Sequence, residues 1–394
     1  MPEPLLARSV AVPDPGPLLD RLPEHGALSW VRDGEGLVAW GEVARHDVRG
    51  ADRFERADAW WQSFVAGLRV DDEVMLPGTG PLAFASFAFA DGPASSVLVV
   101  PRVVLGRRDG VAWLTTLGPT HPDPAPAPVR PPGPLAWSPG GTTPERWRSG
   151  VRWITNAIAR GDLDKAVLAL DEVARAGEAI DPRWVLSRLA DRYPSCWTFS
   201  VDGLVGATPE LLVRRCGTLA ESRVLAGTAR HGRDSGLLES GKDRAEHDYA
   251  VDSLVAGFSA HCKSIRPSEP YLLELANVTH LATDLRARVA DGASLLTLAG
   301  ALHPTAAVGG TPTRTALQVI ARLEPRDRGR YAGPVGWVDG AGDGELGLAL
   351  RCAQLDGPTA RLWAGCGIVA DSDWASELAE ARAKLEPVRS ALGG

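Results

Sequence analysis

The sequence of 394 residues predicts an α+β fold in which helices cover large antiparallel sheets. Two observations carry this prediction. Short β-type runs bounded by Gly, Asp and Pro dominate residues 1–117, and helical periodicity alternates with strand-like runs from residue 144 onward. A chain of this length, with 44% apolar residues, has ample material for a buried core. Disorder as the main state is therefore excluded.

The N-terminal part, residues 1–117, contains the clearest strand signals. The runs at residues 82–89, 95–106 and 111–118 are rich in apolar residues and end at Gly or Asp, so they are predicted strands. A connector at residues 118–143 follows. Its nine prolines exclude a helix or a central strand and indicate an extended surface segment.

The third part of the chain, residues 144–394, begins with a helix. Trp147, Val151, Ile154 and Ile158 lie at i, i+4, i+7 and i+11, which places them on one helical face. Strand-like KAVLAL follows after a glycine. We expect the three parts to form one domain spanning residues 1–394.

Further elements are predicted toward the C-terminus. Helices are expected at residues 185–193, 242–263 and 374–392. The runs LGLALRCAQL (346–355) and ARLWAGCGIV (360–369) predict two antiparallel strands joined by a DGPT turn.

The composition excludes several classes of protein. A net charge of −7 argues against a surface that wraps nucleic acid and against a polybasic membrane patch. The five cysteines show no C-x-x-C pair, which argues against a disulfide framework or a zinc site. The N-terminus lacks the features of a signal peptide, and no apolar run is long enough to span a membrane. We expect a soluble, cytoplasmic protein.

Two buried ionisable groups are candidates for acid–base chemistry. Only four of the 42 basic residues are lysines, and Lys165 begins the apolar run KAVLAL. Burial disfavours an ammonium, so its pKa is expected to fall and Lys165 can act as a base. A lysine at a sheet edge that reaches solvent is the alternative. Glu210, next to two leucines in GATPELL, is a candidate acid because an apolar environment raises a carboxyl pKa.

Carboxylates on two predicted helices are candidate ligands for Mg²⁺. Glu377, Glu380 and Lys384 lie at i, i+3 and i+7, hence on one helical face. Glu246 lies in a second charged segment, GKDRAEHD. A hard cation prefers oxygen ligands, and solvated salt bridging is the alternative interpretation.

Glycine-rich turns offer backbone N–H groups to an anionic ligand. They are LAGTA, which contains Gly227, and AGCGIV, which contains Gly365. An ordinary tight turn is the alternative. GGTPTRT lacks the lysine of a phosphate-binding P-loop, so the sequence does not support binding of a nucleoside triphosphate.

From about residue 147 to the C-terminus, the chain resembles the chorismate-utilising enzymes, in particular the isochorismate synthases. The motifs that carry the resemblance occur in the family's order: LDKAVLAL, GATPELLVRR, ESRVLAGTAR, GKDRAEHD, THLATDL, LHPTAAVGGTP, LEPRDRGRYAGPVGWVDGAGDGE, RLWAGCGIVADSD and ELAEARAKL. The resemblance implies two stacked antiparallel sheets enclosing helices, dependence on Mg²⁺ and chorismate as substrate.

The resemblance also implies roles for individual residues. Lys165 is the expected base that activates water for addition at C2 of chorismate, and Glu210 is the expected acid that protonates the leaving C4 hydroxyl. Glu246 and Glu380 are expected Mg²⁺ ligands, with Glu377 as a direct or water-mediated one. The expected substrate-binding residues are Gly227, Thr228, Arg351, Gly365 and Lys384.

Two other functions stay open at this stage. Salicylate synthase forms isochorismate and then eliminates pyruvate, but Ala307 stands where such enzymes tend to have a hydroxyl residue. A catalytically silent chorismate-binding protein is the second. We expect a monomer without a glutaminase subunit, a nucleic-acid partner or a membrane partner. Its isochorismate would serve menaquinone, siderophore or other biosynthesis.

Overall fold

The computed structural model describes residues 4–119, 127–230, 236–275 and 278–393. The first part of the chain contains β1 (Leu5–Val12), a 3-10 turn (Leu18–Arg21), β2 (Leu28–Arg32), β3 (Glu35–Val48), α1 (Arg53–Ala66), β4 (Leu68–Asp72), β5 (Leu82–Ser86), β6 (Ser96–Arg108), β7 (Val111–Leu117) and β8 (Ala136–Pro139).

The second part contains α2 (Pro144–Ala159), β9 (Lys165–Arg175), α3 (Pro182–Arg192), β10 (Trp197–Val201), β11 (Leu204–Thr208), β12 (Leu211–Cys216), β13 (Leu219–Arg230), α4 (Gly241–Ser259), β14 (Cys262–Pro267), β15 (Tyr271–Glu274), β16 (Val278–Val289), α5 (Leu295–Leu302), β17 (Gly310–Thr311), α6 (Thr313–Leu323), β18 (Pro334–Asp339), β19 (Gly344–Leu348), β20 (Cys352–Asp356), β21 (Thr359–Ile368) and α7 (Trp374–Leu392).

The predicted α+β class is confirmed, and most predicted elements are present. The three N-terminal strands are β5, β6 and β7, and α7 has the predicted bounds. Thr143 caps the start of helix α2, because its side chain accepts a hydrogen bond from the Arg146 N–H. On the predicted apolar face of α2, Trp147, Val151 and Ile154 are buried and Ile158 is half-buried. The β20–β21 hairpin is antiparallel as predicted, with Gly357 in a left-handed conformation at its turn.

Four predictions about element bounds were wrong. Helix α1 was missed within the strand-rich part, and the connector contains β8, an edge strand paired only with β9 among the described residues. The helix expected to reach residue 263 ends at Ser259. The single strand expected over 346–355 is broken between β19 and β20, because Arg351 adopts a positive φ of 46°.

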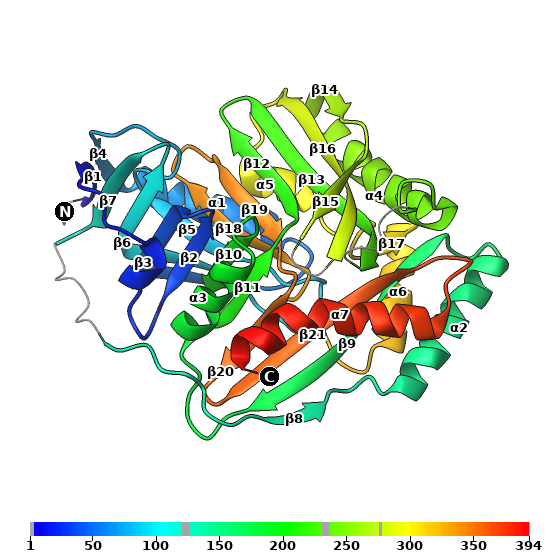
Figure 1. Ribbon diagram of the computed structural model, residues 1–394. Helices are drawn as coiled ribbons and strands as arrows, with labels where there is room; N and C mark the ends of the chain where they lie inside the picture. Colours follow the sequence, from blue (N-terminus) through cyan, green and yellow to red (C-terminus); the bar gives the residue numbers. More distant parts are fainter. Residues whose placement is uncertain (1–3, 120–126, 231–235, 276–277, 394) are drawn as a thin grey trace.

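Two long series of paired strands, called the two arms below, diverge from β6, which also pairs with β7 in a short branch that continues to β1 and β4. The first arm runs through β3, β2, β10, β11, β20, β21 and β9. The second arm runs through β5, β18, β19, β12, β13 and β16. In Figure 1 the β9–β21 pair lies below and the β13–β16 pair lies above. Both arms therefore start from strands of the N-terminal part, because β6 pairs with β3 and with β5.

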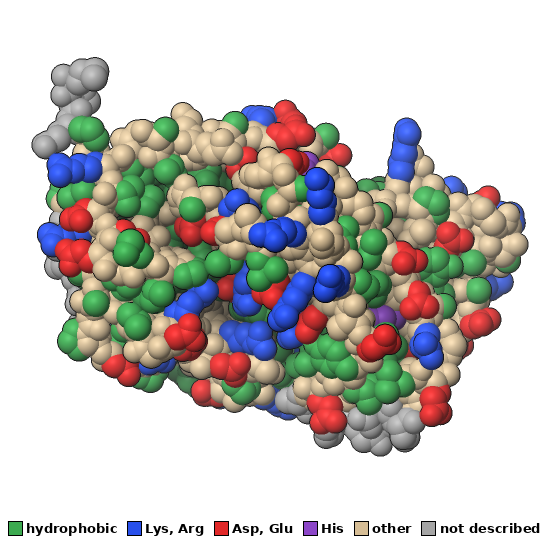
Figure 2. All heavy atoms as spheres, turned by 90° about the horizontal axis from the view of Figure 1, so that it is seen from above, with side chains coloured by type: hydrophobic (Ala, Val, Ile, Leu, Met, Phe, Trp, Pro, Cys, Tyr) green, Lys and Arg blue, Asp and Glu red, His purple; other side chains and the backbone are tan. Residues whose placement is uncertain are grey.

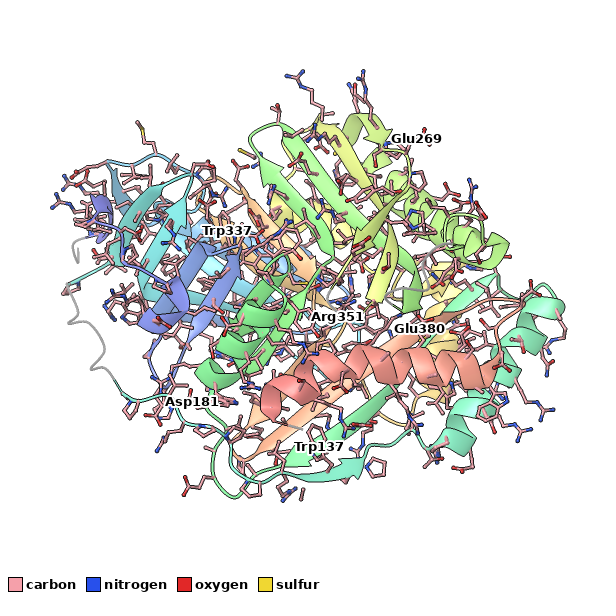
Figure 3. All side chains as sticks on the ribbon, viewed as in Figure 1. Trp137, Asp181, Glu269, Trp337, Arg351 and Glu380 are labelled. Carbon is pink, nitrogen blue, oxygen red and sulfur yellow. The ribbon has the colours of Figure 1, made fainter. Side chains whose placement is uncertain are left out.

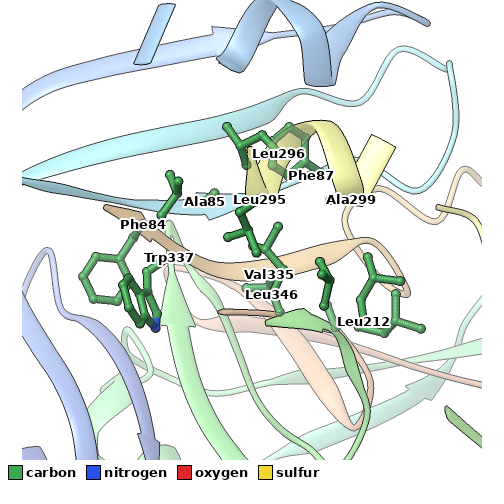
Figure 4. Packing of buried hydrophobic residues seen from close by; sticks show 14 of the residues in the cluster. Phe84, Ala85, Phe87, Leu212, Leu295, Leu296, Ala299, Val335, Trp337 and Leu346 are labelled. Carbon is green, nitrogen blue, oxygen red and sulfur yellow. The ribbon is translucent and has the colours of Figure 1, made fainter. Parts of the chain in front are cut away.

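The buried apolar residues form two cores, each of which includes residues from both arms. One core packs α2, α3, α6 and α7 against the first arm, with Trp147 and Leu385 buried at its centre. The other packs α1, α4 and α5 against the second arm. Figure 4 shows part of this second core, in which Leu295 of α5 lies beside Val335 and Leu346 of the sheet. Burial of apolar area stabilises both cores.

Two adjacent loops carry the chain directly from one arm to the other. The first crossing joins β11 to β12, and the second joins β19 to β20. The two loops are hydrogen-bonded to neighbouring strands through the Glu210 carbonyl, which accepts from Leu348 N–H, and the Arg351 carbonyl, which accepts from Ala207 N–H. These loops therefore bring residues into the space between the arms.

The surface is mixed in charge. On the face shown in Figure 2, acidic and basic side chains are interspersed, and a group of basic side chains gathers around the middle. Among the described residues, every helix is too short or too polar to cross a lipid bilayer.

Candidate active site

A pocket lies between the two arms. Strands β9 and β21 supply one side, and β13 and β16 supply another. Gly365 and Gly367 of β21 both line the pocket. They share one face of the strand because they are two positions apart. The residues that line it are Val167, Pro209, Glu210, Leu225, Ala226, Gly227, Glu246, His280, Ala307, Val308, Arg328, Tyr331, Ala332, Leu350, Arg351, Trp363, Ala364, Gly365, Gly367 and Lys384.

Lys165, the first residue of β9, is completely buried and contacts Glu246, which lines the pocket. Its Nζ lies 3.2 Å from Oε1 of Glu246 on α4 and 3.5 Å from the Glu246 carbonyl oxygen. Gly367 makes room for this pair: a Cβ at that position would lie 2.1 Å from Glu246 Oε1 and 2.7 Å from Lys165 Cε. The lysine is therefore buried, as predicted, but beside a carboxylate partner that local sequence did not predict.

Glu210 lies in the first crossing loop and is only 4% exposed. Burial raises its pKa to about 8, and the opposing effects of a backbone hydrogen bond at Leu225 and of the Lys165, Lys384 and Arg351 charges are smaller. Near neutral pH its carboxyl group is therefore largely protonated and can donate a proton into the pocket.

Arg351, in the second crossing loop, lines the pocket and forms a hydrogen bond with His280. Its Nη2 lies 2.6 Å from His280 Nε2. Burial lowers the pKa of His280 well below its ordinary value, and the charges of Arg351 and Lys384 lower it further. The imidazole is therefore neutral, with Nε2 as the acceptor for Arg351. Nη1 of Arg351 is buried without a hydrogen-bond partner in the described residues, and so it is free to meet an anionic group.

Lys384 of α7 supplies a second buried cation at the pocket wall. Its Nζ lies 2.7 Å from Glu380 Oε1 and donates to the Gly365 carbonyl at 3.3 Å. Burial lowers the pKa of Lys384, but Glu380 and Glu246, with Cys366, outweigh that effect and hold it above its ordinary value. The ammonium is thus charged. Figure 3 shows Glu380 on α7 and Arg351 near the centre of the molecule.

A cluster of acidic side chains adjoins Lys384. Carboxylate oxygens of Glu377 and Glu380 and the Sγ of Cys366 all lie within 4.8 Å of one another. Glu246 is close enough for its charge to act on both Lys384 and Cys366. Two carboxylates of α7 therefore lie close together, and the charge of Glu246 on α4 acts on the same neighbours. Carboxylate oxygens are the donors that Mg²⁺ prefers.

Most of the residues predicted from sequence lie in or beside this pocket. Glu210, Gly227, Glu246, Arg351, Gly365 and Lys384 line it. Lys165 contacts Glu246, whereas Glu380 and Glu377 belong to the adjoining acidic cluster. The backbone of Thr228 pairs with His280, but its side chain lies outside the described residues.

Four polar or aromatic pocket residues were not predicted from the sequence. Tyr331 and Trp363 stack with ring centroids 6.0 Å apart. Arg328 is buried and held by Glu324, and its Nη2 also donates to the Val167 carbonyl. His280 lies within THLATDL and Tyr331 within RGRYAGP, so the motifs contained both, but nothing local indicated their contacts.

The fold and this pocket define an α+β protein in which several buried ionisable groups gather at one site, an arrangement typical of enzymes. The model of the chorismate binding enzyme family matches residues 134–393. The chain therefore belongs to the family of chorismate binding enzymes.

Relatives with known names cover most of the chain. The salicylate biosynthesis isochorismate synthase of Pseudomonas aeruginosa is 33% identical over 93% of this chain and 84% of its own length. Isochorismate synthase MenF of Bacillus subtilis is 37% identical, over 63% of this chain and 55% of its own length. The chain thus spans about half of that second relative.

Solved structures share the fold. The menaquinone-specific isochorismate synthase MenF of Escherichia coli superposes with a TM-score of 0.81 at 23% identity, covering 98% of this chain and 94% of the other. At this level of identity the likeness shows the fold alone.

Proposed function

We propose that this chain converts chorismate to isochorismate by adding water at C2 and releasing the C4 hydroxyl. One observation carries the proposal: a buried lysine and a buried, largely protonated carboxyl group serve one pocket, together with Arg351 and Lys384. The names of the relatives, which are isochorismate synthases, support it. We also propose that residues 1–394 act as one domain, because strands of both halves pair in one network.

In the proposed reaction, Lys165 takes the proton of the attacking water. Water is a weak nucleophile, so a base must accept its proton as the C2–O bond forms. The amine of lysine can accept a proton, whereas a guanidinium stays charged. Glu246 holds the Lys165 side chain in place at 3.2 Å.

Glu210 supplies the proton that the leaving group needs. As the C4–O bond breaks, hydroxide is a poor leaving group, so Glu210 protonates it and water departs. The ring double bonds shift between the two centres. One water is consumed and one released, so substrate and product are isomers, and the two residues end with one proton gained and one lost.

The two carboxylates of chorismate need cationic partners in the pocket. Arg351 offers its unpartnered Nη1, and Lys384 offers a charged ammonium. Burial strengthens both interactions because the pocket walls have a low dielectric response. Gly227 and Gly365 leave space for the ligand to approach the backbone. We assign Thr228 to the same site.

The residues present fit a magnesium ion. Glu246, Glu380 and Glu377 would hold it, with Glu377 bound directly or through water. The donors are carboxylate oxygens, and two of them lie within 4.8 Å of each other. Bound Mg²⁺ would hold the ring carboxylate and stabilise negative charge during the rearrangement.

The test is incubation of the purified chain with chorismate and Mg²⁺, followed by chromatography of the products. Isochorismate as the sole product is the expected result. Salicylate with pyruvate would replace the proposal by a salicylate synthase, and unchanged chorismate would replace it by a binding protein. Ala307, which lines the pocket without a hydroxyl group, favours the first outcome.

The proposal also covers the cellular compartment, the oligomeric state and the use of the product. All five cysteines are free, which suits a reducing compartment such as the cytoplasm. We propose a monomer that works without a glutaminase subunit, and light scattering of the purified chain tests that state. Its isochorismate would serve menaquinone, siderophore or other biosynthesis, and the names of similar proteins mention menaquinone, salicylate and vibriobactin.

A further inference from the structure

Cys366 lies beside the acidic cluster at the end of the pocket, and the proposed function gives it no role. On β21 it stands between Gly365 and Gly367, which face the pocket, so its side chain points to the other face of the strand, toward α7. It is 1% exposed. Its Sγ donates to the carbonyl oxygen of Glu377 at 3.3 Å.

The sulfur has two carboxylates within the reach of one metal ion. Oxygens of Glu377 and Glu380 and the Sγ of Cys366 all lie within 4.8 Å of one another. Metal–sulfur bonds of about 2.3 Å and metal–oxygen bonds of about 2.1 Å require only a small closing movement of the three groups. Among the described residues, no other cysteine belongs to such a group.

We propose that Cys366 turns this site into one that also takes a thiophilic divalent cation, such as Zn²⁺, Cd²⁺ or Co²⁺, through Cys366, Glu377 and Glu380. Mg²⁺ gains nothing from a sulfur ligand, whereas these cations bind thiolate strongly. The thiol proton passes to solvent as the metal–sulfur bond forms, and the two carboxylates with the thiolate give the ion a strongly anionic set of ligands.

The proposal rests on the proposed function only in placing the magnesium ion at the same carboxylates. Because Glu377 and Glu380 serve both ions, a thiophilic cation and Mg²⁺ compete for the site. Lys384, at 2.7 Å from Glu380, must yield part of that contact to either ion. A thiophilic ion held on the α7 side of β21 draws Glu380 toward the sulfur, so we expect it to displace Mg²⁺.

The experiment is a titration of the purified full-length chain with Co²⁺, followed by ultraviolet and visible absorption. Wild type should develop the sulfur-to-metal charge-transfer band of a Co²⁺–thiolate, and excess Mg²⁺ should suppress it. Cys366→Ala and Cys366→Ser should bind Co²⁺ without the band. Cd²⁺ affinity should fall by about tenfold or more in both variants, while Mg²⁺ affinity changes far less.

Cys262→Ala is the matched control. Cys262 is also buried, and burial raises its thiol pKa as it does for Cys366, but it has no such pair of carboxylates. The control should keep the band. A band that is absent in wild type with Co²⁺ bound, or that persists without Cys366, would overturn the inference.

The same preparation separates this inference from the proposed function. Turnover of chorismate with Mg²⁺ but no Co²⁺–thiolate band rejects the thiophilic site alone. A band that depends on Cys366 in a protein that leaves chorismate unchanged upholds the site and rejects the proposed reaction.

Discussion

Lys165 and Glu210 are buried to almost the same degree, yet their electrostatic surroundings are opposite. Lys165 is 0% exposed and has the Glu246 carboxylate at 3.2 Å. Glu210 is 4% exposed and forms no ion pair among the described residues, so burial raises its pKa to about 8. Burial is therefore only one part of the surroundings of an ionisable group. A nearby charge of opposite sign is the other part, and only Lys165 has one in direct contact.

The two residues also differ in how the fold places them. Lys165 lies at the start of a regular strand of the first arm, and its partner comes from α4 beside the second arm. Glu210 lies in a loop where the chain crosses between the arms. The Lys165–Glu246 contact depends on the position of helix α4 relative to strand β9. The raised pKa of Glu210 depends instead on its burial in the crossing loop. The following changes test this difference.

Replacing the lysine should have the largest effect. Lys165→Arg is expected to lower kcat for isochorismate formation about a thousandfold, because a guanidinium cannot accept the proton of water. Lys165→Gln should do the same with less steric demand. Chromatographic product assays give the rate, and circular dichroism reports the fold. Lys263→Arg, at an exposed position, is the control with normal activity. Near-normal turnover in Lys165→Arg would remove the base assignment.

Removing the acid should have the next largest effect. Glu210→Gln is expected to lower kcat about a hundredfold with little change in KM, because an amide fills the same space but cannot protonate the leaving group. Glu269→Gln, at an exposed position shown in Figure 3, is the control. A variant that raises KM and keeps kcat would show that Glu210 only binds substrate.

The pH dependence follows from the raised pKa of Glu210. The carboxyl group must be protonated to act, so activity should persist below pH 8 and fall as the pH rises through about 8. The residual activity of Glu210→Gln should lack this loss. Stability has the same sign: the contribution of neutral Glu210 is complete below its unfolded pKa of 4.5 and is lost as pH rises through about 8. Thermal unfolding of both proteins across this range checks it.

A smaller effect is expected for the histidine that aims Arg351. His280→Leu removes the acceptor at 2.6 Å and should raise KM about tenfold, the loss of one hydrogen bond to a charged group. His280→Gln offers a carbonyl oxygen instead and should restore most of the affinity. Equal KM values for the two variants would leave His280 with a packing role only.

The smallest effect should come from the start of α4, which carries Glu246. The Ser240 side chain accepts a hydrogen bond from the Asp243 N–H, and Ser240→Ala should lower the free energy of unfolding by about 1 kcal/mol. Ser294→Ala, at the start of α5, should cost a similar amount. Mg²⁺ affinity should fall only in Ser240→Ala. If it falls equally in both, the position of Glu246 does not depend on this helix start.

The sequence by itself determined the class of fold, most of the elements and the identity of the chemical groups. Helix α7 and strands β5 to β7 follow from local periodicity, which is set by which side of an element is buried. Edge strand β8 and helix α1 escaped this reasoning, because prolines tolerated at a sheet edge and an amphipathic segment amid strands give weak local signals. The motifs identified the ionisable residues of the site, but they did not predict which of these residues contact one another.

Only the tertiary structure decided which of these residues act together. Lys165 meets Glu246 across 81 positions, and Arg351 meets His280 across 71. Both contacts arise because β6 splits the sheet into two arms and the chain crosses between them at Glu210 and Arg351. A positive φ at Arg351 interrupts a run that periodicity reads as one strand. Pairing over such separations depends on the packing of both arms, which no local pattern encodes.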